Sequence, residues 1–318
     1  MDEFDAIRRF WQPLGEAVRH PWVVAGIGDD GAIVRLPDDQ ELVLSVDTLV
    51  EDVHFPSGIN PHALGWRALA VNLSDLAAMG ATPICYTLAL TTPRLDEDWL
   101  ASVAAGMAEL SGDYGIQLVG GDMTQGPLTL TVQVQGAVPA GLALRRHGAR
   151  PGDRICVSGT LGDAGIALEY LACGAGNDPD IAAVLQRYYY PVPRVALSEL
   201  LRGRASAAVD ISDGLLADLG HITAASGVGA RIDSESLPIS SSLWRLGGDR
   251  SVELAATAGD DYELCFTWPA SAGPVPNEDE AGLPVKVIGE IEEAPGIRLL
   301  REGQPLDVWR SGYSHFSE

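Results

Sequence analysis

The stretch GIGDDGAI, residues 26–33, decides how the first part of the chain folds, and it follows the apolar run WVVA. Its glycines, Gly26, Gly28 and Gly31, spell G-x-G-x-x-G, which is a phosphate-binding pattern when it joins a strand to a helix. Here the apolar run AIVRL follows directly, then the turn cluster PDDQ and a second apolar run, ELVLSVDTL. This order predicts a β-hairpin after the loop. A dinucleotide-binding fold is therefore disfavoured.

The composition of the whole chain narrows the possible classes of function. The chain has 318 residues, enough for two domains of ordinary size, and 46% of them are hydrophobic. A formal net charge of −23 disfavours binding to nucleic acid or to an anionic membrane surface. The sequence has no apolar run of membrane-spanning length and no basic-then-apolar leader. We therefore expect a cytoplasmic protein with neither a nucleic-acid nor a membrane partner.

Lysine is almost absent, and this excludes several phosphate-handling classes. Lys286 is the only lysine, and it lies in a late strand-like run. Walker A loops, protein kinases and pyridoxal-phosphate enzymes each need a lysine within a motif that this sequence lacks. Any phosphate must then be held by arginine, backbone N–H groups or metal ions. The four cysteines form no C-x-x-C pair, and we expect reduced thiols.

Predicted helices and strands mix along the chain in two halves. Asn60 and Pro61 are typical of a helix start, and that helix continues to Gly80. Residues 139–150 show no periodicity and predict a linker between domains at 1–138 and 151–318. In the second half we expect a helix over residues 160–174, a strand over 206–212 that leads into a helix over 214–227, and a strand-rich stretch over 253–268. The fold class is α/β (α+β).

Aspartates follow or end many of the predicted strands. Any one of them could be a turn former or a helix cap. As a set they would repel one another, by about 1 kcal/mol per pair at 4 Å in water and about 4 at an intermediate dielectric. Oxygen ligands without a Cys/His cluster favour Mg²⁺, and the EF-hand calcium spacing is absent. The set comprises Asp29, Asp30, Asp47, Asp122, Asp210, Asp213, Asp260 and Asp261, with Asp75 on the apolar stripe of the first long helix.

Six motifs occur in a fixed order: GIGDDGAI, SVDTLVEDVHF, NLSDLAAMGATP, LVGGDMT, VDISDGLLADLGH and GDDYELCFT. With them the chain resembles the thiamine-monophosphate kinases, a family of aminoimidazole-ribonucleotide synthetase-like ATP enzymes, from about residue 4 to residue 316. The resemblance implies a homodimer that pairs through the sheet of the N-terminal domain. It also implies that ATP and several Mg²⁺ ions bind between the two domains. The implied reaction is direct transfer of the ATP γ-phosphoryl group to thiamine monophosphate, giving thiamine diphosphate.

The resemblance assigns roles to residues that match the motifs. It implies metal ligands at Asp30, Ser45, Asp47, Asp75, Asp122, Asp210 and Asp213. It implies nucleotide contacts at Gly121, Asp122, Arg146 and Ser212. It implies contacts with the acceptor at His54, Asp260, Asp261, Glu263 and Tyr313. No general base is assigned, because the acceptor is a phosphate monoester whose oxygen is already anionic near neutral pH.

Two departures from the family pattern leave points open. Val46 stands before the aspartate of D-T-L, where the family often has a hydroxyl residue, and Asp260 stands where it has glutamate. Which of Asp260, Asp261 and Glu263 meets the acceptor is therefore left open. One alternative is another ATP enzyme of the superfamily, a selenophosphate or amidine-forming synthetase. The first of these needs a reactive cysteine near the N-terminus, whereas the first cysteine here is Cys85. A non-catalytic divalent-ion-binding protein is the other alternative.

Overall fold

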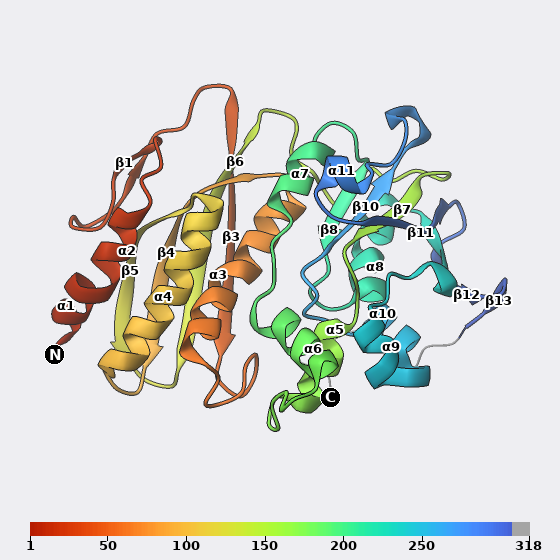
Figure 1. The fold of residues 1–318 in the computed structure, drawn as a ribbon. Helices are drawn as coiled ribbons and strands as arrows, with labels where there is room; N and C mark the ends of the chain where they lie inside the picture. The colour runs from red at the N-terminus through yellow and green to blue at the C-terminus, as the bar shows by residue number, and fades with distance from the viewer. Residues whose placement is uncertain (307–318) are drawn as a thin grey trace. The chain divides into compact units, whose positions relative to one another are not determined.

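The computed structural model describes residues 1–306 and divides the chain into two compact units. Unit 1 comprises Met1–Leu76 and Ala81–Gly141, and unit 2 comprises Ala77–Gly80 and the chain from Leu142 onwards. Each unit combines helices with a β-sheet (Figure 1), so the predicted mixed class is confirmed. The segment after Gly141, predicted as linker, packs on unit 2, where the carbonyl of Arg145 accepts a hydrogen bond of 2.9 Å from the Ala208 N–H.

The sheet of unit 1 has four strands in the order β3-β6-β4-β5. Strand β3 is antiparallel to β6, β6 is antiparallel to β4, and β4 is parallel to β5. Strands β3 and β5 are therefore the two edges. The elements of this unit are α1 (Glu3–Ala6), η1 (Ile7–Trp11), α2 (Gln12–Ala17), β1 (Val23–Ala25), β2 (Ile33–Val34), β3 (Gln40–Val50), α3 (Pro61–Ala78), β4 (Thr82–Thr92), α4 (Glu97–Tyr114), β5 (Gln117–Gln125) and β6 (Thr129–Pro139).

Helices α3 and α4 lie side by side in unit 1 (Figure 1). The predicted start of α3 is confirmed, since the Asn60 side chain accepts hydrogen bonds from the His62 and Ala63 amides. The two helices approach closely at Gly65 and Gly106. A Cβ on Gly65 would lie 2.1 Å from the Val103 carbonyl oxygen, and one on Gly106 would lie 2.0 Å from that of His62. Only glycine permits this spacing.

The N-terminal hairpin differs from the prediction. Strand β2, within the AIVRL run, pairs with β1, whereas β3 pairs with β6. The predicted hairpin between AIVRL and ELVLSVDTL is wrong, because each run finds its partner elsewhere in the fold. No helix follows the glycine loop, which confirms that this is not a dinucleotide-binding βαβ unit. The sequence reading also missed the short helices within residues 3–17.

From Leu42 onwards, exposed and less exposed residues alternate along strand β3. Ser45 and Asp47 are half-buried on one side, whereas Leu42, Leu44 and Val46 on the other are 45%, 55% and 57% exposed. Side chains two residues apart share a face of a strand. One side of β3 therefore carries the polar residues of interest, and the other leaves three large apolar side chains in contact with solvent.

Unit 2 holds a seven-stranded sheet in the order β13-β12-β9-β11-β7-β10-β8. All neighbours are antiparallel except β12 and β9. Its core packs sheet residues such as Val157, Val209 and Cys265 against Leu215 and Leu219. The elements are β7 (Arg154–Ser158), α5 (Asp163–Ala167), η2 (Leu168–Tyr170), α6 (Pro179–Tyr189), α7 (Val195–Leu201), β8 (Ala207–Asp210), α8 (Leu215–Ser226), β9 (Gly229–Asp233), η3 (Ser234–Ser236), α9 (Ser241–Gly247), η4 (Gly248–Arg250), α10 (Ser251–Thr257), β10 (Leu264–Trp268), η5 (Ala270–Ala272), α11 (Glu278–Ala281), β11 (Val285–Glu292), β12 (Gly296–Arg301) and β13 (Gln304–Pro305).

Two secondary-structure predictions for unit 2 need correction. The stretch over residues 253–268, predicted to be strand-rich, begins in helix α10, and the strand β10 starts only at Leu264. The helix predicted over 160–174 is α5 followed by a single 3₁₀ turn. The step from β8 into α8, in contrast, is as predicted.

Three of the four cysteines are buried in strands, and the fourth, Cys173, is exposed. Burial raises the pKa of Cys85 and of Cys156 to about 12, so both stay protonated thiols at neutral pH. The prediction of unpaired thiols is confirmed for all four. Over residues 1–306, none of the helices combines the length and the apolar character needed to cross a bilayer.

Candidate active site

Strand β3 and helix α3 together carry a polar cluster, the β3–α3 cluster, made of Ser45, Asp47, Asn72 and Asp75. The Ser45 hydroxyl donates a hydrogen bond of 2.5 Å to Oδ2 of Asp75. The Asp47 amide donates to Oδ1 of Asn72 at 2.9 Å. Asn72 and Asp75 are three residues apart, so they share the helix face that meets the strand. Three of the predicted metal ligands are thus brought together.

Asn72 was missed by the sequence reading, although it holds the cluster in place. Its side chain is 1% exposed and also donates 3.0 Å to the Ala68 carbonyl oxygen within α3. A buried amide that bonds both its own helix and the backbone of a strand fixes their register. The only sequence signal was its position three residues before Asp75 on the same face.

The opposite edge of the sheet carries Gly121 and Asp122. Asp122 is exposed on β5. Gly121 packs so closely on β4 that an added Cβ would lie 1.9 Å from the Leu88 carbonyl oxygen, which accounts for the glycine. The exposed loop with Asp30 begins at Gly26, whose nearest neighbours include Gln117 and Val119 of β5.

The predicted metal ligands of unit 1 therefore form two groups at opposite edges. In the sheet register, Asp47 of β3 pairs with Val132 of β6. Val132 pairs with Leu88 of β4, and Leu88 pairs with Gly121 of β5. Three strand spacings separate the edges by about 14 Å. No protein-bound Mg²⁺ can span that distance, since its ligand bonds are about 2.1 Å long. Within residues 1–306, no three His, Cys, Asp or Glu side chains converge in an arrangement that could hold a metal.

His54 lies in the turn that follows β3. Its Nδ1 accepts a hydrogen bond of 3.0 Å from the Val50 amide, and the turn is closed by the Asp52 amide bonding the Phe55 carbonyl at 2.8 Å. With Nδ1 as an acceptor, the neutral imidazole carries its proton on Nε2. The half-buried ring is therefore held in one orientation by the backbone.

In unit 2, a loop of four residues, Ile211–Gly214, joins β8 to α8. Asp210 ends the strand and is 5% exposed, while Ser212 and Asp213 are half-buried. Gly214 has φ 121°, and a Cβ there would lie 2.5 Å from the Thr257 carbonyl oxygen, so the turn requires glycine. One oxygen of Asp218 accepts the amides of Ser212, Asp213 and Gly214 at 3.0–3.1 Å.

Asp218 was not singled out in the sequence. Its side chain is 3% exposed, and burial raises its pKa to about 6, partly offset by the three amide hydrogen bonds. Its position in the first turn of α8 suggested only an ordinary acidic residue near a helix N-terminus. The convergence of three amides on it depends on the turn at Gly214, which the sequence pattern does not show.

The GDDYEL segment, residues 259–264, lies beside this loop. The Asp260 amide donates 2.8 Å to the Ser212 carbonyl, and the Tyr262 amide donates 2.8 Å to that of Ile211. Asp260 and Tyr262 both have positive φ, 69° and 50°, and the Tyr262 hydroxyl donates to Oδ1 of Asp260 at 3.0 Å. Such backbone strain in non-glycine residues is typical of functional sites.

The three acidic side chains of this segment have different environments. Glu263 is fully buried and accepts hydrogen bonds from Arg187 at 2.7 Å and from Arg194 at 2.5 and 2.7 Å. Asp261, 3% exposed, accepts the Gly162 amide, and its burial raises its pKa well above the ordinary value. Asp260 is half-exposed. Two of the three carboxylates therefore face inwards, towards partners within unit 2.

Two further predicted contacts remain. Arg146 is exposed in the segment after Gly141, where its carbonyl accepts a hydrogen bond of 3.4 Å from Ser226. Tyr313 lies outside the described residues, so its place in the site stays a prediction.

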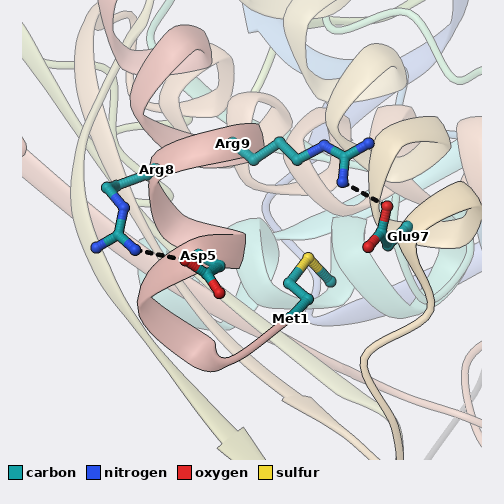
Figure 2. Close-up of a pocket in the computed structure, with 5 residues that line it drawn as sticks. All are labelled: Met1, Asp5, Arg8, Arg9 and Glu97. Carbon is teal, nitrogen blue, oxygen red and sulfur yellow. Dashed lines mark hydrogen bonds and ion pairs between the residues drawn. The ribbon is translucent and has the colours of Figure 1, made fainter.

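Two surface hollows do not coincide with these groups. The larger, about 450 Å³, is lined by Met1, Asp5, Arg8, Arg9 and Glu97. Figure 2 shows Arg8 turned to Asp5 and Arg9 turned to Glu97, so its charges pair with each other. A second, of about 320 Å³, includes Met123 and Thr124, next to Asp122 at the end of β5.

Comparison with known proteins accounts for the order of these motifs. Residues 28–138 match the N-terminal domain of AIR synthase related proteins, and residues 150–301 match their C-terminal domain. The chain is 43% identical over 321 aligned residues to the thiamine-monophosphate kinase of Salmonella typhimurium, covering 99% of this chain and 98% of that one. The chain belongs to the thiamine-monophosphate kinase family. The resemblance noted in the sequence is thereby confirmed, as is the two-domain fold class.

Solved structures of the thiamine-monophosphate kinase family agree in fold. The enzyme from Stenotrophomonas maltophilia superimposes with a TM-score of 0.87 at 43% identity, covering 96% of this chain and 98% of that one. A structure of AaThiL in complex with AMPPCP and TMP superimposes with a TM-score of 0.80 at 33% identity, covering 99% and 97%. Family membership does not by itself assign a role to each residue of this chain.

Proposed function

We propose that this chain transfers the γ-phosphoryl group of ATP to thiamine monophosphate, producing thiamine diphosphate and ADP. The observation that carries the proposal is the nearly full-length similarity to AaThiL, whose structure contains AMPPCP and TMP. The donor is then ATP, of which AMPPCP is an analogue, and the acceptor is the phosphate of thiamine monophosphate. The unpaired cysteine thiols support a cytoplasmic location.

The residues of the site suit phosphoryl transfer without a general base. A phosphate monoester has a second pKa near 6, so its attacking oxygen is anionic at neutral pH. Catalysis then requires positioning and neutralisation of charge. We assign positioning of the acceptor to His54, whose ring orientation is fixed by the Val50 amide. Tyr313 keeps its predicted role as a flat surface for the acceptor rings.

We propose that Mg²⁺ is held by the carboxylates of the β3–α3 cluster and of the β8–α8 connection. Asp47, Asp75 and the Ser45 hydroxyl offer hard oxygen donors at the β3 edge, and Asp210 and Asp213 offer them in unit 2. When bound, Mg²⁺ neutralises phosphate charge and polarises the transferred group. In the β3–α3 cluster, Asn72 fixes the Asp47 backbone, and the Ser45 hydroxyl fixes one oxygen of Asp75. The exposed Arg146 remains our candidate for a phosphate of the nucleotide.

Among the acidic side chains of the GDDYEL segment, we assign the acceptor contact to Asp260. It is the half-exposed member, and Tyr262 fixes one of its oxygens. Glu263 and Asp261 instead hold the segment from inside, through two arginines and the Gly162 amide. This assignment narrows the three alternatives that the sequence left open.

We propose that two copies pair through the exposed face of β3. Leu42, Leu44 and Val46 present a row of apolar side chains that a partner would remove from water. Val46 therefore serves the interface rather than a metal, which explains why a hydroxyl is unnecessary there.

Pairing of two copies also offers a solution for the two groups of carboxylates that lie at opposite edges of the sheet. If the β3 edge of one copy lies beside the β5 edge of the other, Asp47 and Asp122 of different copies complete one site.

The test of the proposed function is ADP formation with a panel of acceptors. Purified protein is incubated with ATP and Mg²⁺ in parallel reactions. Each reaction contains one acceptor: thiamine monophosphate, thiamine, selenide or a carboxamide substrate of the amidine-forming class. We expect ADP only with thiamine monophosphate. ADP formation that depends on selenide or on a carboxamide would show that the chain catalyses another reaction of the superfamily. Nucleotide binding without ADP from any acceptor would support the non-catalytic alternative.

A further inference from the structure

The loop before α8 is organised around a single carboxylate oxygen. Oδ2 of Asp218 accepts hydrogen bonds from three successive amides, those of Ser212 at 3.1 Å, Asp213 at 3.0 Å and Gly214 at 3.1 Å. The Asp218 side chain is 3% exposed. Three bonds to one buried acceptor fix three consecutive peptide units, and this leaves the loop little freedom.

Converging backbone amides at a helix N-terminus are a common binding site for phosphate. Here the chain fills that site with its own carboxylate. The amides of this loop are therefore unavailable to the phosphates of a nucleotide. The loop must then act through the side chains of Ser212 and Asp213, which are half-buried, and of Asp210 before them.

The other side of the same loop is held by the GDDYEL segment. The carbonyls of Ile211 and Ser212 accept the amides of Tyr262 and Asp260, each at 2.8 Å. The Ile211 amide in turn donates 2.8 Å to the Glu263 carbonyl. The loop is thus fixed by two sets of hydrogen bonds, one to the Asp218 side chain and one to the backbone of the GDDYEL segment. Only the first set depends on a side chain.

Helix capping alone does not describe this arrangement. In a capping box, the side chain at the third helical position bonds the amide of the N-cap residue. Asp218 is the fourth residue of α8, and its bonds extend past the N-cap residue Gly214 to the two residues before it. Its hydrogen bonds therefore order the loop as well as the helix end.

We infer that Asp218 is a positioning residue for the metal and nucleotide site, holding the Ser212 and Asp213 side chains in their working orientation. The inference rests on the proposed function, because that function gives Ser212 and Asp213 their ligands. Asp218 is buried and bonds the backbone of the loop, so it acts through the loop. Its loss should weaken the binding of ATP with Mg²⁺ and leave the binding of thiamine monophosphate almost unchanged.

The experiment compares Asp218→Ala, Asp218→Asn and a control, Asp96→Ala. Asp96 caps α4 in unit 1 by accepting the Trp99 amide at 3.1 Å, so its loss costs a helix cap in the unit that does not contain this loop. Asp218→Asn keeps one carbonyl oxygen that can accept the three amides. Each variant is measured for melting temperature, for KM of both substrates, for the Mg²⁺ concentration at half-maximal rate, and for hydrogen exchange of residues 211–214.

We expect Asp218→Ala to raise the ATP KM and the half-maximal Mg²⁺ concentration at least ~10-fold, with a change under about 3-fold in the KM for thiamine monophosphate. The 211–214 amides should exchange faster, and Asp218→Asn should restore both properties in part. A purely structural role predicts that Asp218→Ala, like Asp96→Ala, lowers only the melting temperature. That result would overturn the inference, as would equal defects in both KM values.

Hydrogen exchange separates failure of this inference from failure of the proposed function. If the wild-type protein forms no thiamine diphosphate, the function is wrong, yet the exchange of 211–214 in the Asn variant still tests the hydrogen bonds. If Asp218→Ala does not fold, the Asn variant decides the matter. Protection equal to wild type together with a selective loss of ATP affinity in the Asn variant would contradict an effect through loop order.

Discussion

The Ser45 hydroxyl and the Asp75 carboxylate are joined by a hydrogen bond of 2.5 Å between strand β3 and helix α3. The Asp47 backbone is held to the same helix through Asn72, so α3 anchors the strand beside both carboxylates. Two half-buried carboxylates beside each other repel, and a cation relieves that repulsion. A metal ion bound at this cluster would neutralise the charge of both carboxylates.

Asp47→Asn and Asp122→Asn should each fold normally and lose nearly all turnover. A neutral amide binds Mg²⁺ poorly, while the removal of one charge lowers repulsion in the metal-free protein. We therefore expect unchanged or raised melting temperatures without Mg²⁺, and rates reduced by at least ~10³-fold. Asp38→Asn, in an exposed turn, is the control and should keep full activity. Normal turnover in either site variant at low Mg²⁺ would remove that residue from the metal site.

Mixing inactive variants tests whether two copies share each site. If Asp47 of one copy works with Asp122 of the other, a mixed dimer of Asp47→Asn and Asp122→Asn has one intact site and one doubly altered site. Random reassociation should then recover about a quarter of wild-type activity. The matched control is Asp47→Asn with Asp75→Asn, which lie in one cluster and should recover none. Dimers that form but stay inactive in the first mixture would contradict a shared site.

The buried Asp261 predicts a dependence of stability on pH. Its pKa is raised in the folded state, chiefly by burial, so the folded protein holds this proton more tightly than the unfolded chain does. The contribution of Asp261 to the free energy of unfolding therefore falls as the pH rises. The fall begins near pH 4, about the pKa of an Asp side chain in the unfolded chain, and ends at the raised pKa of the folded state. Asp261→Asn carries no charge at any pH. Its free energy of unfolding relative to wild type should increase over this range and then level off, measured by urea denaturation. A difference that is constant with pH would show that folding does not raise the pKa of Asp261.

Asp260 and Glu263 should fail in different ways. Asp260→Ala should raise the KM for thiamine monophosphate about 10-fold with little change in stability, as expected for a contact with the acceptor. Glu263→Gln leaves Arg187 and Arg194 facing a neutral amide, and breaking a buried ion pair costs about 3 kcal/mol of folding free energy or more. Kinetics with each substrate varied in turn, and urea denaturation, distinguish the two. A raised KM for thiamine monophosphate in Glu263→Gln, with a loss of stability in Asp260→Ala instead, would show that Glu263 contacts the acceptor.

Local signals predicted a large part of the fold. The capped start of α3, the strand-to-helix step at Asp210 and the absence of a helix after Gly31 all follow from residues close together in the chain. Pairing of β3 with β6 joins residues 79 to 99 positions apart, so the apolar pattern alone suggested the nearer partner, β2. Helix α10 was missed because its apolar run also suits a buried strand.

Part of the candidate site could likewise be predicted from the sequence, and part could not. Charge and motif order singled out Asp47 within β3, Asp75 within α3 and Asp213 in the loop before α8. Asn72 and Asp218 were missed, because their importance comes from buried hydrogen bonds that only the folded chain reveals. The sequence also could not separate Asp260 from Glu263, since burial distinguishes them and their motif does not.

The most direct test of the central claim is a count of both products from one reaction. The wild-type protein is incubated with ATP labelled in the γ-phosphoryl group, Mg²⁺ and thiamine monophosphate, and ADP and thiamine diphosphate are separated and quantified. We predict one labelled thiamine diphosphate for each ADP, with the label in its terminal phosphoryl group and no ADP when thiamine monophosphate is omitted. ADP release without labelled thiamine diphosphate, or ADP release independent of thiamine monophosphate, would contradict the account.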